Sequence, residues 1–562
     1  MINKPLFDKA VVDEATKKLI DSLKQTCGSY GLGNDGNEYK IIIQVFLYKY
    51  FNDKFAYEAK LVPIYGERLS KAEKWDEEYD KFTDDEIEEL FAFLPANTPH
   101  LRPEHTVHHL NNRIGDGDFS FLFDSTMVNI AHLNADIFSM ATVNKTKLTI
   151  FEEITVYIPD SSQRDEFAIA LMRHIAKPET NFEAIFSMKY DFFSTMFEYL
   201  IKDYNKDGGG KYAEYYTPRS IADIMARLLV GDNKDLRGVT CYDPSAGSGT
   251  LLMALAHQVG EDRCTIFSQD ISQKSSKMLR LNLILNNLVG SIQNIIQGNT
   301  LLNPGHRDKE GKIKKFDFIV SNPPFKLDFP DERDQIAKDN VRFWAGVPNS
   351  PKEINPDKPK MEIYLCFIQH MLYSLTENGK GAIVVPTGFI TGKTGIKKKI
   401  LERIVDKHIV YGVIQMPSRI FATTGTNVSV LFFDKSGKND NVVLIDASHM
   451  GHDEKDGNNL RTFLDQTEID TIVDTFNNKE KINGFSVVVS HQDVKDNGYS
   501  LNAGQYFDVN IEYTDITHDE FIKRMSEYKS QLQTMLNADK EYNEQLMSQL
   551  DKLIFNDYAV SE

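Results

Sequence analysis

Four consecutive residues that follow a short apolar stretch at 316–320 have a specific chemical use. The four residues are Asn322, Pro323, Pro324 and Phe325. The asparagine side-chain oxygen and the first proline carbonyl can each accept one N–H of an exocyclic amine, while the phenylalanine ring stacks on the base that carries it. An amine held in this way is bent toward tetrahedral geometry, which frees its lone pair to accept a methyl group. We call these residues the Asn-Pro-Pro-Phe motif.

A second motif is rich in glycine and follows a predicted strand at 238–242. We call it the glycine turn, and its residues are Asp243, Pro244, Ser245, Ala246, Gly247, Ser248, Gly249 and Thr250. Glycines permit a tight turn and a close approach of the backbone to a ligand. The sequence lacks the lysine pattern of a phosphate-binding NTPase loop. A ligand-binding turn and a purely structural turn both fit this pattern.

Two polar residues stand at the ends of the next predicted strands. Asp270 lies roughly twenty residues beyond the glycine turn, where a carboxylate can accept the hydroxyl protons of a ribose. Asn299 lies further along the chain, and its amide could read the edge of an adenine. A helix cap is the alternative role for Asp270, and a turn is the alternative for Asn299.

A third motif precedes a helix predicted over 220–229. Its residues are Glu214, Tyr215, Tyr216, Thr217, Pro218 and Arg219. The Thr217 hydroxyl and the free N–H groups at the start of the helix could bind a carboxylate. A plain helix start, with proline in its first turn, is the alternative.

The elements between these motifs alternate between strands and helices. Strands are predicted at 238–242, 265–269, 316–320, 381–385, 410–415 and 428–434, and helices at 276–287 and 363–376. This alternation indicates an α/β fold with a doubly wound, Rossmann-like sheet. Ligands bind such sheets at the carboxyl ends of the strands, which is where the motifs fall.

The chain is too long for one core, and we expect four parts. They are an N-terminal helical domain at 1–180, the α/β domain at 181–440, an acidic and irregular extension at 441–512, and a coiled-coil-like assembly helix at 513–562. The last strand is expected to end near Asp434, and the charged stretch 326–360 is expected to form a mobile loop. In the final part, apolar residues follow a four-three spacing, which is typical of a packing seam.

Composition limits the partners of the chain. The formal net charge is −18, which argues against DNA binding over a broad basic surface. From residue 441 onward there are 10 lysines and arginines against 23 aspartates and glutamates. Apolar runs are too short to span a membrane, and the four cysteines are scattered. We therefore expect a cytoplasmic protein without a membrane contact or a structural zinc ion.

Together these motifs resemble the adenine-N6 DNA methyltransferases, and most closely the modification (M) subunit of type I restriction-modification systems. The resemblance implies that the Asn-Pro-Pro-Phe motif is catalytic and that the cofactor is S-adenosylmethionine. It implies a cofactor site built from Glu214, Tyr215, Tyr216, Thr217, Pro218, Arg219, Asp243, Ser245, Ala246, Gly247, Gly249, Asp270 and Asn299. The family more often has Glu where Asp270 stands and Asp where Asn299 stands.

The resemblance also implies partners and a mechanism. The methyl group passes directly to an adenine flipped out of DNA, with no metal ion. A separate specificity (S) subunit reads the sequence, a restriction (R) subunit joins for cleavage, and a second copy of the chain sits in the complex.

Two alternatives stay open. A methyltransferase acting on RNA or on a protein glutamine amide uses a similar motif, because each presents an amine with a delocalised lone pair. A catalytically silent scaffold would keep only the fold and its cofactor pocket. Cytosine C5 chemistry is excluded, because it needs a nucleophilic cysteine, usually after a proline, and no cysteine in this chain follows a proline.

Overall fold

The chain divides into two compact units, Met1–Phe507 and Asp508–Glu562. The computed structural model describes residues 9–33, 36–138, 140–141, 147–148, 150–186, 217–231, 235–352, 360–421, 427–456, 459–507 and 516–554. Each unit is described by itself below.

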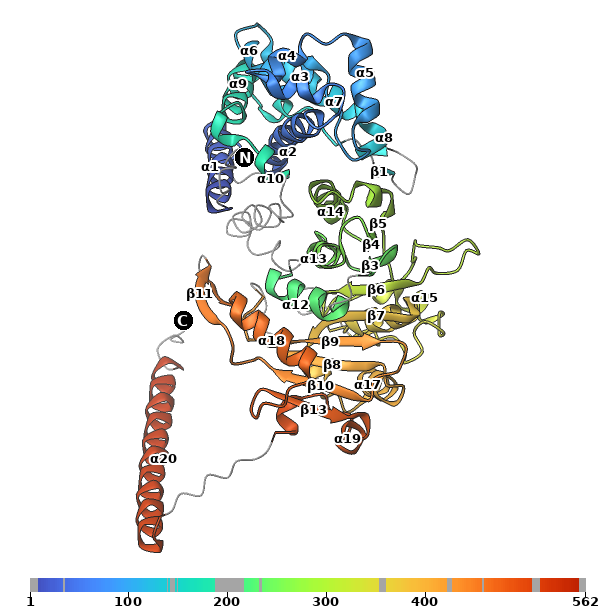
Figure 1. Cartoon of the computed structure of the whole chain (residues 1–562). Helices are drawn as coiled ribbons and strands as arrows, with labels where there is room; N and C mark the ends of the chain where they lie inside the picture. The colour runs from blue at the N-terminus through green and yellow to red at the C-terminus, as the bar shows by residue number, and fades with distance from the viewer. Residues whose placement is uncertain are drawn as a thin grey trace, which may run out of the picture. The chain divides into compact units, whose positions relative to one another are not determined.

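The first part of the first unit is mainly helical, as predicted (Figure 1). Its helices are α1 (Lys9–Ser29), α2 (Gly36–Ala59), α3 (Gly66–Lys71), α4 (Trp75–Tyr79), α5 (Asp84–Phe93), α6 (Val107–Asn112), α7 (Phe119–Leu133), α8 (Ala135–Phe138), α9 (Arg164–Ile175) and α10 (Glu183–Phe186). A short antiparallel pair joins β1 (Met140–Ala141) to β2 (Lys147–Leu148). A capping box opens α5, because Glu86 N–H donates to the Thr83 hydroxyl and Thr83 N–H donates to the Glu86 carboxylate.

A nine-stranded sheet forms the rest of this unit, in the order β13-β10-β8-β9-β7-β6-β3-β4-β5. The strands are β3 (Val239–Asp243), β4 (Cys264–Asp270), β5 (Ile295–Gln297), β6 (Phe316–Ser321), β7 (Leu375–Pro386), β8 (Val410–Gln415), β9 (Val428–Asp434), β10 (Asn441–Asp446) and β13 (Ser486–Ser490). The five strands from β7 to β5 in this order run parallel, while β9 and β13 run antiparallel to their neighbours. The predicted α/β fold is confirmed.

Helices cover both faces of the sheet because its strands are apolar on both sides. In β7, Ala382 and Val384 join one buried cluster, while Ile383 and Val385 join the other. The first cluster packs against α12 (Arg219–Val230), α13 (Thr250–Val259), α14 (Gln273–Leu285) and α18 (Gln466–Asn478). The second packs against α16 (Tyr364–Ser374), α17 (Gly395–Asp406) and α19 (His491–Asp496). Figure 1 shows α12, α13, α14, α17, α18 and α19 beside the sheet.

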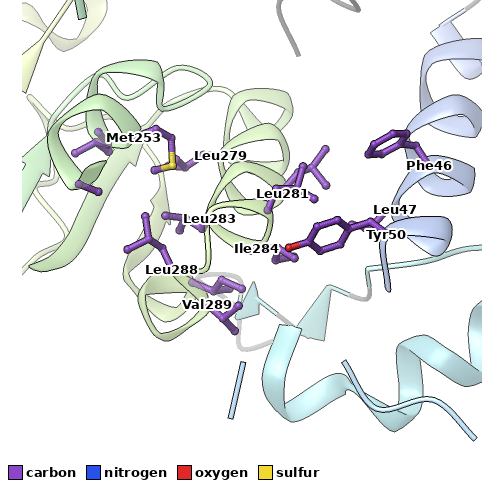
Figure 2. Close-up of a cluster of buried hydrophobic side chains, with 14 of the residues drawn as sticks. Phe46, Leu47, Tyr50, Met253, Leu279, Leu281, Leu283, Ile284, Leu288 and Val289 are labelled. Atoms are coloured by element: carbon purple, nitrogen blue, oxygen red, sulfur yellow. The ribbon is translucent and has the colours of Figure 1, made fainter. Parts of the chain in front are cut away.

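The N-terminal helices share a core with the sheet. Phe46 and Tyr50 of α2 and Leu281 and Ile284 of α14 belong to one buried cluster, and Figure 2 shows them facing one another. Each of these side chains is at most 9% exposed. The helical part is therefore packed against α14, on one side of the sheet, through apolar contacts.

Two expectations about the later chain are wrong. Residues 441–490 contribute β10 and β13 to the main sheet, so the region after Asp434 is not irregular. A hairpin of β11 (His452–Asp456) and β12 (Asn459–Phe463) lies between these strands in sequence. The stretch 326–360 was expected to be a mobile loop, but it contains α15 (Pro330–Ala337). Phe329, Phe343 and Val347 in this stretch are buried. Residues 353–359 lie outside the described part.

The second unit contains one long helix, α20 (His518–Ile554). The large apolar side chains whose exposure is described in this helix are exposed within the second unit: Phe521, Ile522, Met525, Tyr528, Leu532, Met535, Leu536, Tyr542, Leu546, Met547 and Leu550. The predicted four-three spacing thus lies on a single continuous helix. Among the described residues, no helix is long and apolar enough to cross a membrane.

Candidate functional site

The glycine turn connects β3 to α13 in a conformation that requires glycine. Gly247 has φ +52° and Gly249 has φ +86°, both in the left-handed region. A Cβ atom on Gly249 would lie 2.2 Å from Leu279 Cδ1, so the turn also packs tightly on α14. The backbone is thus held close to the sheet edge at the first turn of α13.

Asp270, at the end of β4, is tied to this turn. Its Oδ2 accepts the N–H of Gly247 at 2.9 Å and its Oδ1 accepts the N–H of Ser272 at 2.8 Å. Burial raises the pKa of this carboxyl above its ordinary value. Each carboxylate oxygen has a second lone pair, so the hydrogen bonds that position Asp270 leave it able to accept a ribose hydroxyl.

Asp243, at the end of β3, is completely buried. Its Oδ1 accepts the N–H of Ser245 at 2.9 Å, which closes the start of the turn. Burial is the main cause that raises the pKa of Asp243 to about 8; the charge of Asp270 acts in the same direction, and the hydrogen bonds from Ser245 and Ser321 act against it. Near neutral pH it is therefore unfavourable for Asp243 and Asp270 to be ionised at the same time.

Asn299 has the turn role that the sequence left open. Its side-chain oxygen accepts the N–H groups of Leu301 and Leu302 at 3.1 and 3.2 Å. The neighbouring Thr300 hydroxyl donates to the Pro244 carbonyl at 2.7 Å, which joins this turn to the glycine turn. A contact between Asn299 and an adenine stays a prediction.

The Asn-Pro-Pro-Phe motif follows β6 at the same edge of the sheet. Asn322 is half-buried, and its amide nitrogen donates to the Thr217 hydroxyl at 3.1 Å. Pro323 is buried, whereas Phe325 is half-buried and its ring meets Tyr364 edge-on, with 6.4 Å between centroids. This bond involves the Asn322 amide nitrogen and not its oxygen.

The third motif is described only in part. Glu214, Tyr215 and Tyr216 lie outside the described residues. Thr217 is buried, Pro218 precedes α12, and Arg219 is the first residue of that helix. Thr217 is therefore the residue of this motif that contacts the site, through its hydrogen bond with Asn322.

Two residues that the sequence did not single out hold this edge together. Ser321, the last residue of β6, shares a hydrogen bond of 2.6 Å with the Ser245 hydroxyl. Arg342, only 2% exposed, donates to the Thr300 and Leu301 carbonyls and pairs with Asp339 at 3.0 Å. A small polar residue directly before the motif was a signal for Ser321, whereas nothing in the sequence distinguished Arg342.

The site therefore places four structures side by side: the glycine turn, the Asp270 carboxylate, the Asn299 turn and the Asn-Pro-Pro-Phe motif. Their hydrogen bonds link β3, β4 and β6, which are adjacent or one strand apart in the sheet. One end of this arrangement offers acceptors suited to a ribose, and the other offers an acceptor pair suited to an amine. These residue types, gathered at one edge of the sheet, are the ones that a methyltransferase acting on an amino group would need.

Comparison with known proteins agrees with this class. A solved methyltransferase subunit of a type I restriction-modification system from Streptococcus thermophilus has the same fold, with a TM-score of 0.68. It is 21% identical, and the match covers 88% of this chain and 100% of that one. The family described as N-6 DNA Methylase matches residues 188–515, more than half of the sequence. The chain belongs to the N-6 DNA methylase family.

Two characterised relatives bear out the resemblance to type I modification subunits. The Type I restriction enzyme MpnII methylase subunit of Mycoplasma pneumoniae is 28% identical over 364 residues, which cover 62% of this chain. The Type I restriction enzyme MjaIX methylase subunit of Methanocaldococcus jannaschii is 26% identical over 384 residues, which cover 65% of this chain. The aligned part spans 64% of the length of each relative.

Proposed function

We propose that this protein transfers a methyl group from S-adenosylmethionine to the N6 atom of an adenine flipped out of DNA. It does so as the modification subunit of a type I restriction-modification complex. The observation that carries the proposal is the hydrogen bond from the Asn322 amide to Thr217, beside the glycine turn. That bond orients the asparagine so that its oxygen is presented to an incoming amine.

The motif supplies what an adenine amine needs in order to react. The Asn322 oxygen and the Pro323 carbonyl each accept one N–H, which localises the nitrogen lone pair. The prolines fix the backbone, so the carbonyl stays in place during the reaction. Phe325 is half-buried and braced by Tyr364, and it offers one face on which a flipped base can stack.

The residues of the glycine turn and the strand ends fit the cofactor. Asp270 would accept the ribose hydroxyls, and Asn299 would lie toward the adenine. Thr217 and the start of α12 would hold the carboxylate end, together with the preceding residues Glu214, Tyr215 and Tyr216. The remaining residues of the proposed cofactor site are Pro218, Arg219, Asp243, Ser245, Ala246, Gly247 and Gly249. Bound there, S-adenosylmethionine supplies the methyl group from its sulfonium.

Sequence reading is assigned to another subunit. The region after residue 441 is acidic, and α20 carries a row of exposed apolar side chains. An acidic surface repels phosphates, whereas an apolar helix favours a protein partner. We assign α20 to assembly with a specificity subunit, in a complex that holds a second copy of this chain and that a restriction subunit joins. A division into a helical part, an α/β part that includes residues 441–490, and an assembly helix belongs to this proposal.

The substrate class is tested by transfer of a radiolabelled methyl group to duplex DNA, total RNA and protein. The purified chain is assayed alone and together with a specificity subunit. We expect labelled DNA, weakly with the chain alone and strongly with the added subunit. Label in RNA or protein instead would favour the alternative substrates, and efficient site-specific DNA methylation by the chain alone would contradict the role of the specificity subunit.

A silent scaffold is tested at Asn322. The Asn322→Ala variant removes the acceptor oxygen and should lose methylation by at least about 100-fold while S-adenosylmethionine still binds. Asn322→Asp is the matched control, because it keeps an oxygen acceptor and should retain part of the activity. Unchanged methylation by Asn322→Ala would refute the catalytic role.

A further inference from the structure

The most basic uninterrupted segment near the motif is residues 387–399. It contains four lysines, Lys393, Lys397, Lys398 and Lys399, and no aspartate or glutamate, in a chain whose net charge is −18. Lys393, Lys398 and Lys399 are exposed. The local charge is thus opposite in sign to that of the whole molecule, which marks this segment as a surface for an anionic partner.

This segment lies at the same edge of the sheet as the Asn-Pro-Pro-Phe motif. β6 and β7 run parallel with Ser321 opposite Ile383, so the motif and the residues after Pro386 leave the sheet in the same direction. The segment thus begins one strand away from the motif.

Side-chain contacts hold the segment close to the motif. Phe325 meets Tyr364 at 6.4 Å between ring centroids, and Tyr364 meets Phe389 at 6.0 Å. Lys397 pairs with Glu362 at 2.8 Å, two residues before Tyr364. The ring of Phe325 is therefore joined to Phe389, at the start of the segment, through the ring of Tyr364.

Three of the lysines keep their charge available to a partner. Among the described residues, Lys393 and Lys399 have no carboxylate within ion-pair distance, and Lys398 has only Glu402, at 3.6 Å with both side chains exposed. An exposed pair of this kind contributes little and exchanges readily for a stronger anion. Lys397 is different, because its pair with Glu362 serves to fix the segment.

We propose that Lys393, Lys398 and Lys399 contact the phosphates of the DNA strand that carries the target base. This inference rests on the proposed function and assigns the DNA contact to this chain beside its reacting centre. A lysine is a compact charge on a flexible stem, which suits sequence-independent phosphate contact. Base reading stays with the specificity subunit, while these lysines hold the strand from which the base is flipped.

The test compares Lys393→Gln/Lys398→Gln/Lys399→Gln with a matched control, Lys309→Gln/Lys312→Gln/Lys438→Gln. The control lysines are also exposed but lie at the opposite edge, before β6 begins and after the antiparallel β9 ends. Both variants are assembled with the specificity subunit. Binding to duplex DNA is measured over a range of salt concentrations, and S-adenosylmethionine binding by calorimetry.

We expect the first variant to bind DNA about tenfold or more weakly at 0.1 M salt, with a salt slope shallower by roughly 0.9 for each lost phosphate contact. The control should bind like the wild type, and cofactor affinity should be unchanged in both. DNA binding by the first variant equal to that of the control would overturn the inference. It would also be overturned if the first variant assembled poorly with the specificity subunit but its assembled complex bound DNA normally.

The proposed function fails in a different way. A wild-type complex that binds DNA through these lysines but transfers no methyl group would refute the function and leave the phosphate contact standing. A wild-type complex that binds no DNA at any salt concentration would contradict both.

Discussion

Asn322 and Thr217 form the contact on which the chemistry depends at the scale of single residues. Thr217→Val keeps the shape of the side chain but removes the hydroxyl that fixes the Asn322 amide. We expect the rate of methyl transfer to fall about tenfold or more, since one hydrogen bond contributes about 1 to 1.5 kcal/mol. Single-turnover methylation at saturating cofactor measures this rate apart from binding.

Thr217→Ser is the control for that prediction. It restores the hydroxyl and should recover most of the rate, even if the affinity for S-adenosylmethionine changes. Equal rates for the valine and serine variants would show that the hydroxyl does not position Asn322.

Asp243 gives a pH-dependent prediction. Its pKa is raised to about 8 in the folded protein from an ordinary value of 3.8, so the folded state holds a proton that the unfolded state releases. The contribution of Asp243 to the free energy of unfolding is therefore greatest below about pH 4. It falls as the pH rises toward 8, by at most about 1.4 kcal/mol per pH unit. Asp243→Asn cannot titrate and should lack this slope.

Urea unfolding of both proteins at pH 5, 6 and 7 measures the effect. The stability of Asp243→Asn relative to the wild type should rise with pH. A difference that stays constant, or that falls with pH, would mean that the carboxyl is ionised in the folded protein across this range.

The sequence predicted the individual residues of the motifs but not the bonds between them. Asn322 and Thr217 were separate candidates, and they lie 105 positions apart, so no local spacing could show that they touch. Arg342 could not be predicted, because one arginine in a charged stretch has no distinguishing pattern until folding buries it against two carbonyls.

At the scale of elements, the glycine turn depends on its contact with α14. Gly249→Ala should destabilise the protein by about 2 to 4 kcal/mol, because its φ of +86° strains an L-residue and its Cβ would collide with Leu279. Thermal or urea unfolding without cofactor measures the loss.

Leu279→Ala separates the two causes. Alone, Leu279→Ala should destabilise the protein because it leaves a cavity. Combined with Gly249→Ala it removes the collision, so the double variant should lose at least about 1 kcal/mol less unfolding free energy than the sum of the two single variants. Strictly additive losses would mean that backbone strain alone, and not packing on α14, requires the glycine.

The strands were predicted where burial on both faces gives a continuous apolar run. β8 (Val410–Gln415) and β9 (Val428–Asp434) match the predicted bounds, and β3, β4 and β6 differ by one residue or so at their ends. β5 was predicted only through its end before Asn299, and its range was not predicted because three residues are too few for a pattern. β10 and β13 were missed because the acidic composition around them hid two short apolar runs.

At the scale of the whole molecule, assembly is assigned to α20. Leu532→Glu/Met535→Glu places charges on its exposed apolar residues and should reduce co-purification with a specificity subunit by about tenfold or more. Ser530→Glu/Gln533→Glu adds the same charge at polar, exposed positions of the same helix and should leave association nearly unchanged.

Cofactor binding should be the same in both of these variants, because α20 belongs to a separate compact unit. An equal loss of association in the two variants would point to a general charge effect. Association that survives the apolar substitutions would remove α20 from the assembly surface.

The most direct test of the central claim is the identity of the methylated nucleoside. DNA treated with the complex and S-adenosylmethionine is digested, and its nucleosides are measured by mass spectrometry, with the Asn322→Ala complex in parallel. We predict N6-methyladenine from the wild type and at least about 100-fold less from the variant. N4-methylcytosine in its place, or an equal yield of N6-methyladenine from both complexes, would contradict the account.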